Sequence, residues 1–231
     1  MLGGAYHNGT MLKDNSVYTN GWVCTDGGDG VRGFVHPQYD RRALSDYGYK
    51  TLSGDRNVAN GNTSWSKLPN GSYITGESSE LAWHPNLVNT AYLGNGNALW
   101  RTDDNGTSFV QVHDFGEKVT SIEVAYSDPN TIYACTYLGW WDAKNVWRST
   151  DAGATWTTIT PSSAQLNGNT WVPYDIAVSG TDPQTIWLLR TSQYGDYPNH
   201  DGYVAYKSTN GGTSWTNITT TGLNGEWPTN I

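Results

Sequence analysis

Apolar and polar residues alternate in short runs along much of the chain, which is the pattern of half-buried β-strands. The clearest case is the stretch 119–126, where Ile122 and Val124 are separated by polar neighbours. A turn rich in Asp and Pro follows at 127–130. Further runs predict strands over 131–137, 145–148 and 155–160. We therefore expect four antiparallel strands in this part of the chain.

Two motifs repeat in step with each other. The first contains a cation, a hydroxyl residue, an Asp or Asn, a glycine and a closing aromatic, and it occurs at 101–109, 148–156 and 207–215, with a weaker copy at 59–65. The second is a turn between apolar runs, marked by Pro37, Pro85, Pro129 and Pro183. Both motifs recur at intervals of roughly 44 to 59 residues, close to the repeat lengths of propeller blades.

The first motif has a local chemistry that predicts a hairpin between the third and fourth strands of each unit. In the copy at 148–156, Asp151 is expected to accept backbone N–H bonds and Gly153 to adopt a positive φ. Trp156 is expected to cover the hairpin as an apolar lid. The corresponding residues of the other copies are Asp104, Gly106, Phe109, Asn210, Gly212 and Trp215. All of these roles are structural.

These motifs resemble those of the Asp-box (BNR-repeat) β-propellers, a group that includes sialidases, xyloglucanases and the sortilin ectodomain. The repeats cover nearly the whole chain. The resemblance implies an all-β fold, namely a β-propeller built of four-stranded antiparallel Asp-box blades, from a secreted or cell-surface bacterial protein. It implies a fold and not an activity, because one fold hosts many functions.

The repeats divide the chain into blades at 31–68, 79–115, 119–160 and 172–220. Residues 1–30 resemble the last three strands of a further, partial blade, and 221–231 resemble the start of the next. Because Asp-box propellers usually close with six or more blades, the resemblance implies an incomplete propeller whose partners include the remaining blades of a parent protein. The alternative is a five-bladed ring in which 226–231 pairs beside 10–12.

Composition excludes several partners and cofactors. A net charge of −8 with only 13 Lys and Arg argues against nucleic acid, which needs a basic surface. No apolar run approaches the roughly 18 residues of a membrane span. No metal-loop spacing is complete, so we expect neither a metal nor another cofactor. Cys24 and Cys135 form either a disulfide or two small buried thiols.

In propellers of this family the boxes lie on one face, and related enzymes and receptors bind on the other. That second face carries the connections between strands two and three, which here are 138–142 and 192–202. Their aromatic and polar side chains suit stacking on sugar rings and hydrogen bonds to hydroxyl groups. The candidate ligand-binding residues are Trp140, Trp141, Asp142, Tyr194, Asp196, Tyr197 and His200. The alternative is that the two tryptophans pack under neighbouring loops.

The sequence leaves a binding and a catalytic function open, beside the alternative of a purely structural array. The first is a non-catalytic propeller module that binds a glycan or a protein. The second is a glycoside hydrolase, for which two facing carboxyl groups are needed. Asp29 and Asp175 stand at equal distances before Pro37 and Pro183, so they are the candidate catalytic pair, with Glu80 and Glu123 as weaker candidates.

The structural alternative for this pair is that Asp29 serves a glycine turn and Asp175 caps a loop. No FRIP-type motif occurs near the start of the chain, which argues against a sialidase.

Overall fold

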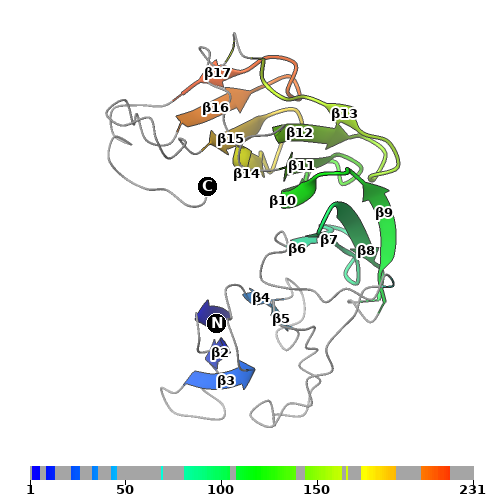
Figure 1. Ribbon diagram of the computed structural model, residues 1–231, viewed down its shortest axis with the longest axis vertical. Helices are drawn as coiled ribbons and strands as arrows, with labels where there is room; N and C mark the ends of the chain where they lie inside the picture. Colours follow the sequence, from blue (N-terminus) through cyan, green and yellow to red (C-terminus); the bar gives the residue numbers. More distant parts are fainter. Residues whose placement is uncertain are drawn as a thin grey trace.

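The computed structural model describes residues 2–5, 9–13, 22–26, 33–35, 43–45, 69, 81–104, 108–138, 144–162, 165, 173–190 and 204–218. Every regular element among these residues is a β-strand (Figure 1). This confirms the predicted all-β class. No helix long and apolar enough to cross a membrane occurs in these segments.

Three four-stranded antiparallel sheets form the best described part of the molecule, each with its strands side by side in chain order. The first contains β6 (Leu81–Trp83), β7 (Ala91–Asn95), β8 (Ala98–Thr102) and β9 (Val110–Asp114). The second contains β10 (Lys118–Val124), β11 (Ile132–Tyr137), β12 (Lys144–Ser149) and β13 (Thr157–Thr158). The third contains β14 (Pro173–Val178), β15 (Ile186–Arg190), β16 (Val204–Ser208) and β17 (Thr216–Asn217). These sheets have the four-stranded antiparallel form that was predicted for the propeller blades.

Two smaller sheets precede the blades. A three-stranded sheet contains β1 (Leu2–Ala5), β2 (Gly9–Lys13) and β3 (Trp22–Asp26). A two-stranded sheet contains β4 (Gly33–Val35) and β5 (Ala43–Ser45), and β4 contacts β1. The proposed pairing of 226–231 lies outside the described residues.

The β10–β13 blade shows how local chemistry fixes the strands. Its first three strands agree with the predicted ranges to within two residues at each end. The fourth is shorter than predicted, since only Thr157 and Thr158 pair with β12. The backbone N–H of Thr155 is bound to the Asp151 side chain, so this part of the predicted strand belongs to the turn instead.

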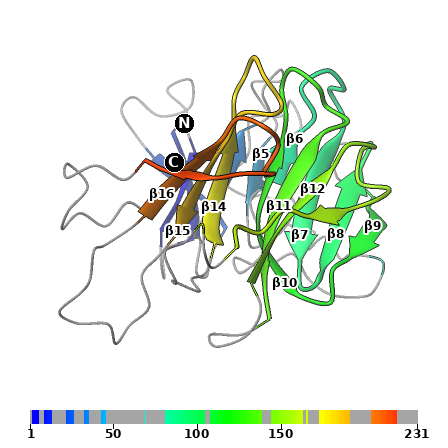
Figure 2. The ribbon, with the colours of Figure 1, turned by 90° about the horizontal axis from the view of Figure 1, so that it is seen from above.

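Adjacent blades pack face to face through apolar side chains. β10 contacts β6, β7 and β8 of the preceding blade and β14 of the following one, and the three blades follow one another along an arc (Figures 1 and 2). Between the first two blades the buried residues are Ala82, Tyr92, Leu99, Val119, Ile122, Val124 and Ile132. Burial between these faces forms much of the core, and a further buried cluster that includes Leu93 and Trp100 lies within the β6–β9 blade.

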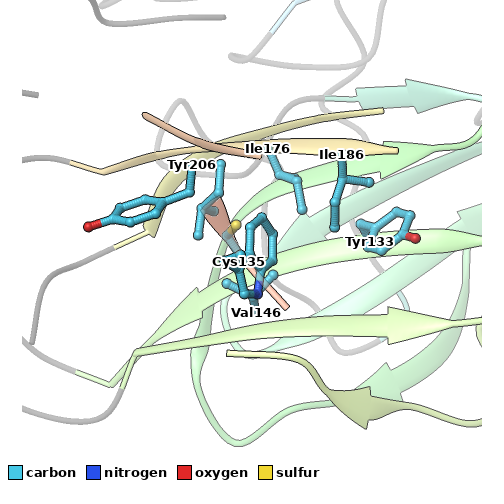
Figure 3. Packing of buried hydrophobic residues seen from close by; sticks show 8 residues of the cluster. Tyr133, Cys135, Val146, Ile176, Ile186 and Tyr206 are labelled. Carbon is cyan, nitrogen blue, oxygen red and sulfur yellow. The ribbon is translucent and has the colours of Figure 1, made fainter. Parts of the chain in front are cut away.

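The second interface is the larger apolar cluster and is shown in Figure 3. It combines Tyr133, Cys135 and Val146 with residues of the β14–β17 blade, namely Ile176, Ile186, Leu188, Tyr206 and Trp215. The hydroxyl of Tyr133 also donates to the backbone carbonyl of Pro183 at 2.7 Å, across the two blades.

Cys135 lies in this interface as a free, fully buried cysteine. Burial raises the pKa of its thiol well above the ordinary value, and the nearby Asp175 carboxylate raises it further. The protonated thiol acts as a small apolar side chain.

Candidate functional site

The strand registers give every blade two different ends. At one end Val124 pairs with Ile132, which pairs with Ser149, so the turn between strands one and two lies beside the Asp box. At the other end Tyr137 pairs with Lys144, where strands two and three are connected. We call these the box face and the opposite face. The box hairpin is tied to the neighbouring turn by Ala152 N–H, which donates to the Asn130 carbonyl at 2.8 Å.

A short hydrogen-bond network builds the box of the β10–β13 blade. The carboxylate of Asp151 accepts from the Thr155 backbone N–H at 2.8 Å and from the Thr155 hydroxyl at 2.6 Å. Ser149 donates its hydroxyl to the same carboxylate at 2.8 Å and accepts from the Gly153 N–H at 2.8 Å. Gly153 has a φ of 92°, a backbone conformation that favours glycine.

The other boxes keep this plan with different residues. Asp104 accepts from the backbone and the hydroxyl of Ser108 at 2.9 and 2.6 Å. Asn210 accepts the Ser214 N–H at 2.9 Å and replaces the second bond by donating its own amide to the Ser214 hydroxyl at 2.8 Å. An amide therefore performs the task of the carboxylate. Gly106 lies outside the described residues.

The lid interpretation supposed that each closing aromatic covers its own hairpin. In the structure these side chains also make contacts outside the hairpin. Trp156 donates its indole N–H to the carbonyl of Gly153 at 2.8 Å within the hairpin. Its ring also packs on Phe115 of the preceding connection, with ring centroids 5.0 Å apart. Trp215 donates to the carbonyl of Ile159, a residue of the preceding blade, at 3.1 Å. The box is therefore part of the contact between blades.

The sequence analysis assigned no role to the cation that begins each box. In the described boxes this side chain lies over an aromatic ring of the neighbouring strand or contacts the next box. Arg101 lies 5.8 Å from the ring centroid of Tyr92, and Lys207 lies 5.4 Å from that of Trp187. Arg148 instead extends to the next box, where a Cβ added at Gly211 would lie 2.3 Å from its guanidinium.

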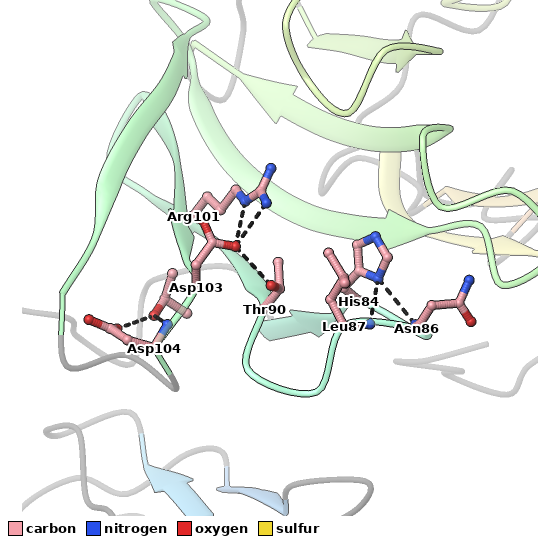
Figure 4. A network of polar contacts seen from close by, with 8 residues as sticks. His84, Asn86, Leu87, Thr90, Arg101, Asp103 and Asp104 are labelled. Atoms are coloured by element: carbon pink, nitrogen blue, oxygen red, sulfur yellow. Dashed lines mark hydrogen bonds and ion pairs between the residues drawn. The ribbon is translucent and has the colours of Figure 1, made fainter.

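The box face of the β6–β9 blade also carries a polar network, shown in Figure 4. Asp103 accepts from the guanidinium of Arg101 at 2.8 Å and from the hydroxyl of Thr90 at 2.8 Å. Nδ1 of His84 accepts the backbone N–H groups of Asn86 and Leu87 at 3.1 and 3.0 Å. Burial and the positive charge of Arg101 lower the pKa of His84. The hydrogen bonds of His84 lie within the turn between β6 and β7.

The opposite face differs between blades in the length of its connections. In the β6–β9 blade strands two and three are joined by Gly96 and Asn97 alone, with Gly96 at a φ of 57°. The same connection spans 138–143 in the next blade and 191–203 in the last. The link between these two blades, 159–172, is long as well. The additional chain is therefore concentrated on the opposite face of two adjacent blades.

The described edge of this face is built around Glu117. Its carboxylate accepts from the hydroxyl of Thr136 at 2.5 Å and from the side-chain amide of Asn145 at 2.7 Å. Next to it Lys118 lies over the ring of Tyr137, 5.9 Å from the centroid. Leu138, which follows Tyr137, is 59% exposed.

The match to a protein-family model shows to which family the chain belongs. The Sortilin-Vps10 model, described as sortilin, neurotensin receptor 3, matches residues 97–230, more than half of the sequence. The chain belongs to the Sortilin-Vps10 family. No curated protein sequence matches it.

Solved structures similar to this Sortilin-Vps10 chain are themselves propellers. An ancestral GH74 enzyme matches with a TM-score of 0.64 and 18% identity, over 93% of this chain and 29% of that one. A GH74 xyloglucanase from Xanthomonas campestris matches with a TM-score of 0.49 and 15% identity, over 95% and 28%. YCF48 bound to D1 peptide matches with a TM-score of 0.45 and 14% identity, over 67% and 43%. The chain thus spans less than a third of either GH74 enzyme, and at these identities the likeness concerns the fold.

Asp175 is the one member of the candidate catalytic pair that the structure describes. It is buried between two blades, where its carboxylate accepts from the Ser121 hydroxyl at 2.8 Å and from the Ile176 N–H at 2.9 Å. Ser121 and Asp175 hold corresponding positions of their blades, each following a register shift in strand one. Both described bonds are structural. Asp29 lies outside the described residues, so the pairing stays a prediction.

All seven candidate ligand-binding residues lie outside the described residues, namely Trp140, Trp141, Asp142, Tyr194, Asp196, Tyr197 and His200. Within the described segments, no group of three His, Cys, Asp or Glu side chains could hold a metal ion. The sequence interpretation missed Glu117, because a single Glu after a glycine carries no pattern that distinguishes it.

Replacing Asp151 tests the box. Hydrogen bonds lower the pKa of its carboxyl to about 2, first among them those from the side chain and backbone of Thr155. Because the folded pKa lies below the unfolded value of 3.8, the stabilisation is complete above that pH and is lost as the pH falls through about 2. We expect Asp151→Ala to lower the melting temperature by about 2 °C at neutral pH.

Asp151→Asn is the matched control, because Asn210 already fills this position in the next blade. The asparagine variant should keep most of the stability at neutral pH and lose less of it between pH 4 and pH 2 than the parent. Melting curves over this pH range measure both effects. An asparagine variant as unstable as the alanine one would contradict the assigned bonds.

Proposed function

We propose that this chain is a non-catalytic module of a secreted or cell-surface protein that binds a glycan or a protein through its opposite face. The unequal connections carry this proposal. A blade of this fold closes with Gly96 and Asn97 alone, so the longer connections at 138–143 and 191–203 exceed what the fold requires. Long loops on a rigid scaffold commonly carry binding residues.

The composition of these connections supports a ligand with apolar and hydroxyl-bearing surfaces. Trp140, Trp141, Tyr194 and Tyr197 offer rings for stacking, and Asp142 offers a hydrogen-bond acceptor. The receptor named by the family model favours binding over catalysis, and further blades of a parent protein complete the proposed assembly.

A glycoside hydrolase is the second candidate, favoured by the fold of the ancestral GH74 enzyme. Such an enzyme needs one carboxyl group held protonated and one ionised beside the glycosidic bond. The burial of Asp175 and its bonds to Ser121 and Ile176 favour the non-catalytic function, since a carboxylate committed to the contact between blades is poorly placed for proton transfer to a substrate.

Binding arrays test the proposal. The chain is applied to arrays of plant and animal oligosaccharides, including xyloglucan fragments, and to a display library of peptides. We expect binding without release of reducing sugar, and a loss of affinity of about tenfold or more in Trp140→Ala or Trp141→Ala. Tyr126→Ala is the control, because Tyr126 is an aromatic residue that is 69% exposed on the box face. Release of reducing sugar would overturn the non-catalytic function, and equal losses in all three variants would overturn the assigned face.

A further inference from the structure

Glu117 connects two parts of the opposite face that are distant in sequence. It lies in the short link 115–117, between the last strand of one blade and β10 of the next. Its side chain is half-buried and reaches across to β11 and β12, where it binds Thr136 and Asn145. One carboxylate thus holds the ends of two strands with both of its oxygens.

The residues that Glu117 holds form a cross-strand pair next to the last rung of the ladder. Thr136 pairs with Asn145, and Tyr137 pairs with Lys144 immediately beyond them. Thr136 is fully buried, so its hydroxyl depends on partners within the protein. It donates to Glu117 and accepts the indole N–H of Trp147 at 2.8 Å.

The network continues through the fourth-strand side of the blade. The carbonyl oxygen of the Asn145 side chain accepts from the hydroxyl of Thr160 at 3.1 Å, and that hydroxyl accepts the Val146 N–H at 3.0 Å. Hydrogen bonds to an ionised group are shorter and stronger than neutral ones, so the Glu117 carboxylate is the central acceptor. The whole edge is fixed by side chains drawn from every part of the blade.

The other two four-stranded blades have different residues at the ladder position of Thr136 and Asn145. At the ladder position of Thr136 and Asn145, the β6–β9 blade has Asn95 and Ala98. The β14–β17 blade has Arg190 and Val204. Among the three described blades, only the β10–β13 blade therefore has the Thr and Asn pair that Glu117 binds. A feature that the common fold does not require indicates a task specific to this edge.

We propose that Glu117 is a positioning residue of the ligand-binding face. It holds the ends of β11 and β12, and with them the exposed Leu138 and the ring of Tyr137 beneath Lys118, in one arrangement that a sugar ring can contact. The inference rests on the proposed function, with a glycan as the ligand. A binding residue held by its supporting hydrogen bonds loses little freedom when the ligand arrives.

The first measurement needs no ligand. In Glu117→Ala the Thr136 hydroxyl loses its acceptor and can turn away from Trp147, so the indole N–H resonance of Trp147 should shift in a ¹⁵N-¹H spectrum. The backbone N–H groups of Tyr137 and Leu138 should exchange with deuterium about tenfold faster. Glu117→Gln keeps one of the two acceptor oxygens, so its changes should be smaller. Asp128→Asn, which makes the same change of a carboxylate to an amide in the β10–β11 turn on the box face, is the control and should leave both readouts unchanged.

The second measurement uses a xyloglucan heptasaccharide and isothermal titration with the same variants. We expect its affinity to fall about tenfold in Glu117→Ala, less in Glu117→Gln, and not at all in Asp128→Asn. An unchanged Trp147 resonance and unchanged exchange in both Glu117 variants would overturn the positioning role. Altered spectra with unaltered affinity would overturn its link to the ligand. If the parent chain binds no oligosaccharide while the spectra change as expected, Glu117 still holds the ends of β11 and β12, and the proposed glycan function fails.

Discussion

Replacement of Trp215 by alanine is expected to lower the free energy of unfolding by about 3 kcal/mol, the lower end of the usual range for truncating a buried tryptophan. The ring is 7% exposed and packs in the interface cluster with Ile159, Ile176 and Tyr206. Its indole N–H also donates to the Ile159 carbonyl, so the variant removes a contact between blades as well as apolar area. Thermal unfolding should shift downward by roughly 6–12 °C.

The chain supplies its own control for this variant. Phe109 closes the box of the β6–β9 blade and is 4% exposed, so a phenylalanine can fill the same position. Trp215→Phe should cost about 1 kcal/mol, mainly through the lost hydrogen bond to Ile159. Ligand binding should be unchanged in both variants. Equal stability of the alanine variant and the parent would mean that the closing aromatic stabilises neither its own hairpin nor the contact between blades.

The fold was predictable because its signals are local and repeated. The alternation around Ile122 and Val124 predicts a strand with one buried face, and both side chains are buried between blades. The roles expected of Asp151 and Gly153 likewise depend on residues within the same hairpin. Contacts of this kind can be predicted because the residues that make them are close together in the sequence.

Contacts between blades were not predictable in the same way. Trp215 reaches Ile159, and Tyr133 reaches Pro183, across two sheets. The sequence pattern within one blade does not indicate which carbonyl group of another blade accepts a hydrogen bond from these donors. The lid interpretation of the closing aromatics was therefore incomplete, although the residues themselves were chosen correctly by their repetition.

The candidate site shows the same division. Counting from the prolines placed Asp175 in the first strand of its blade, and it lies in β14. The same counting could not reveal that Ser121 of the preceding blade donates to it. Glu117 depends on a register between β11 and β12 that exists only after folding, because Thr136 and Asn145 are brought together by the ladder.

Replacement of Gly212 by alanine is expected to have an effect as large as that of Trp215→Ala, for a different reason. Gly212 has a φ of 89°, and a Cβ added there would lie 2.5 Å from Cδ1 and 2.7 Å from Cβ of Ile159. The left-handed backbone conformation costs roughly 1–2 kcal/mol for a residue with a Cβ, and overpacking costs a further 1–3 kcal/mol. Urea unfolding should show a total loss of about 3 kcal/mol.

Two other glycines separate these contributions. Gly96 has a φ of 57° with no atom within 4 Å of an added Cβ, so Gly96→Ala should show the backbone cost alone. At Gly180 neither a positive φ nor a close atom is present, and its alanine variant should be neutral or slightly stabilised, because alanine restricts the unfolded chain. The expected order of stability is therefore Gly180→Ala, then Gly96→Ala, then Gly212→Ala. If Gly212→Ala and Gly96→Ala were equally stable, Ile159 would have to move aside at no cost, and the close packing of the box on the preceding blade would not contribute to stability.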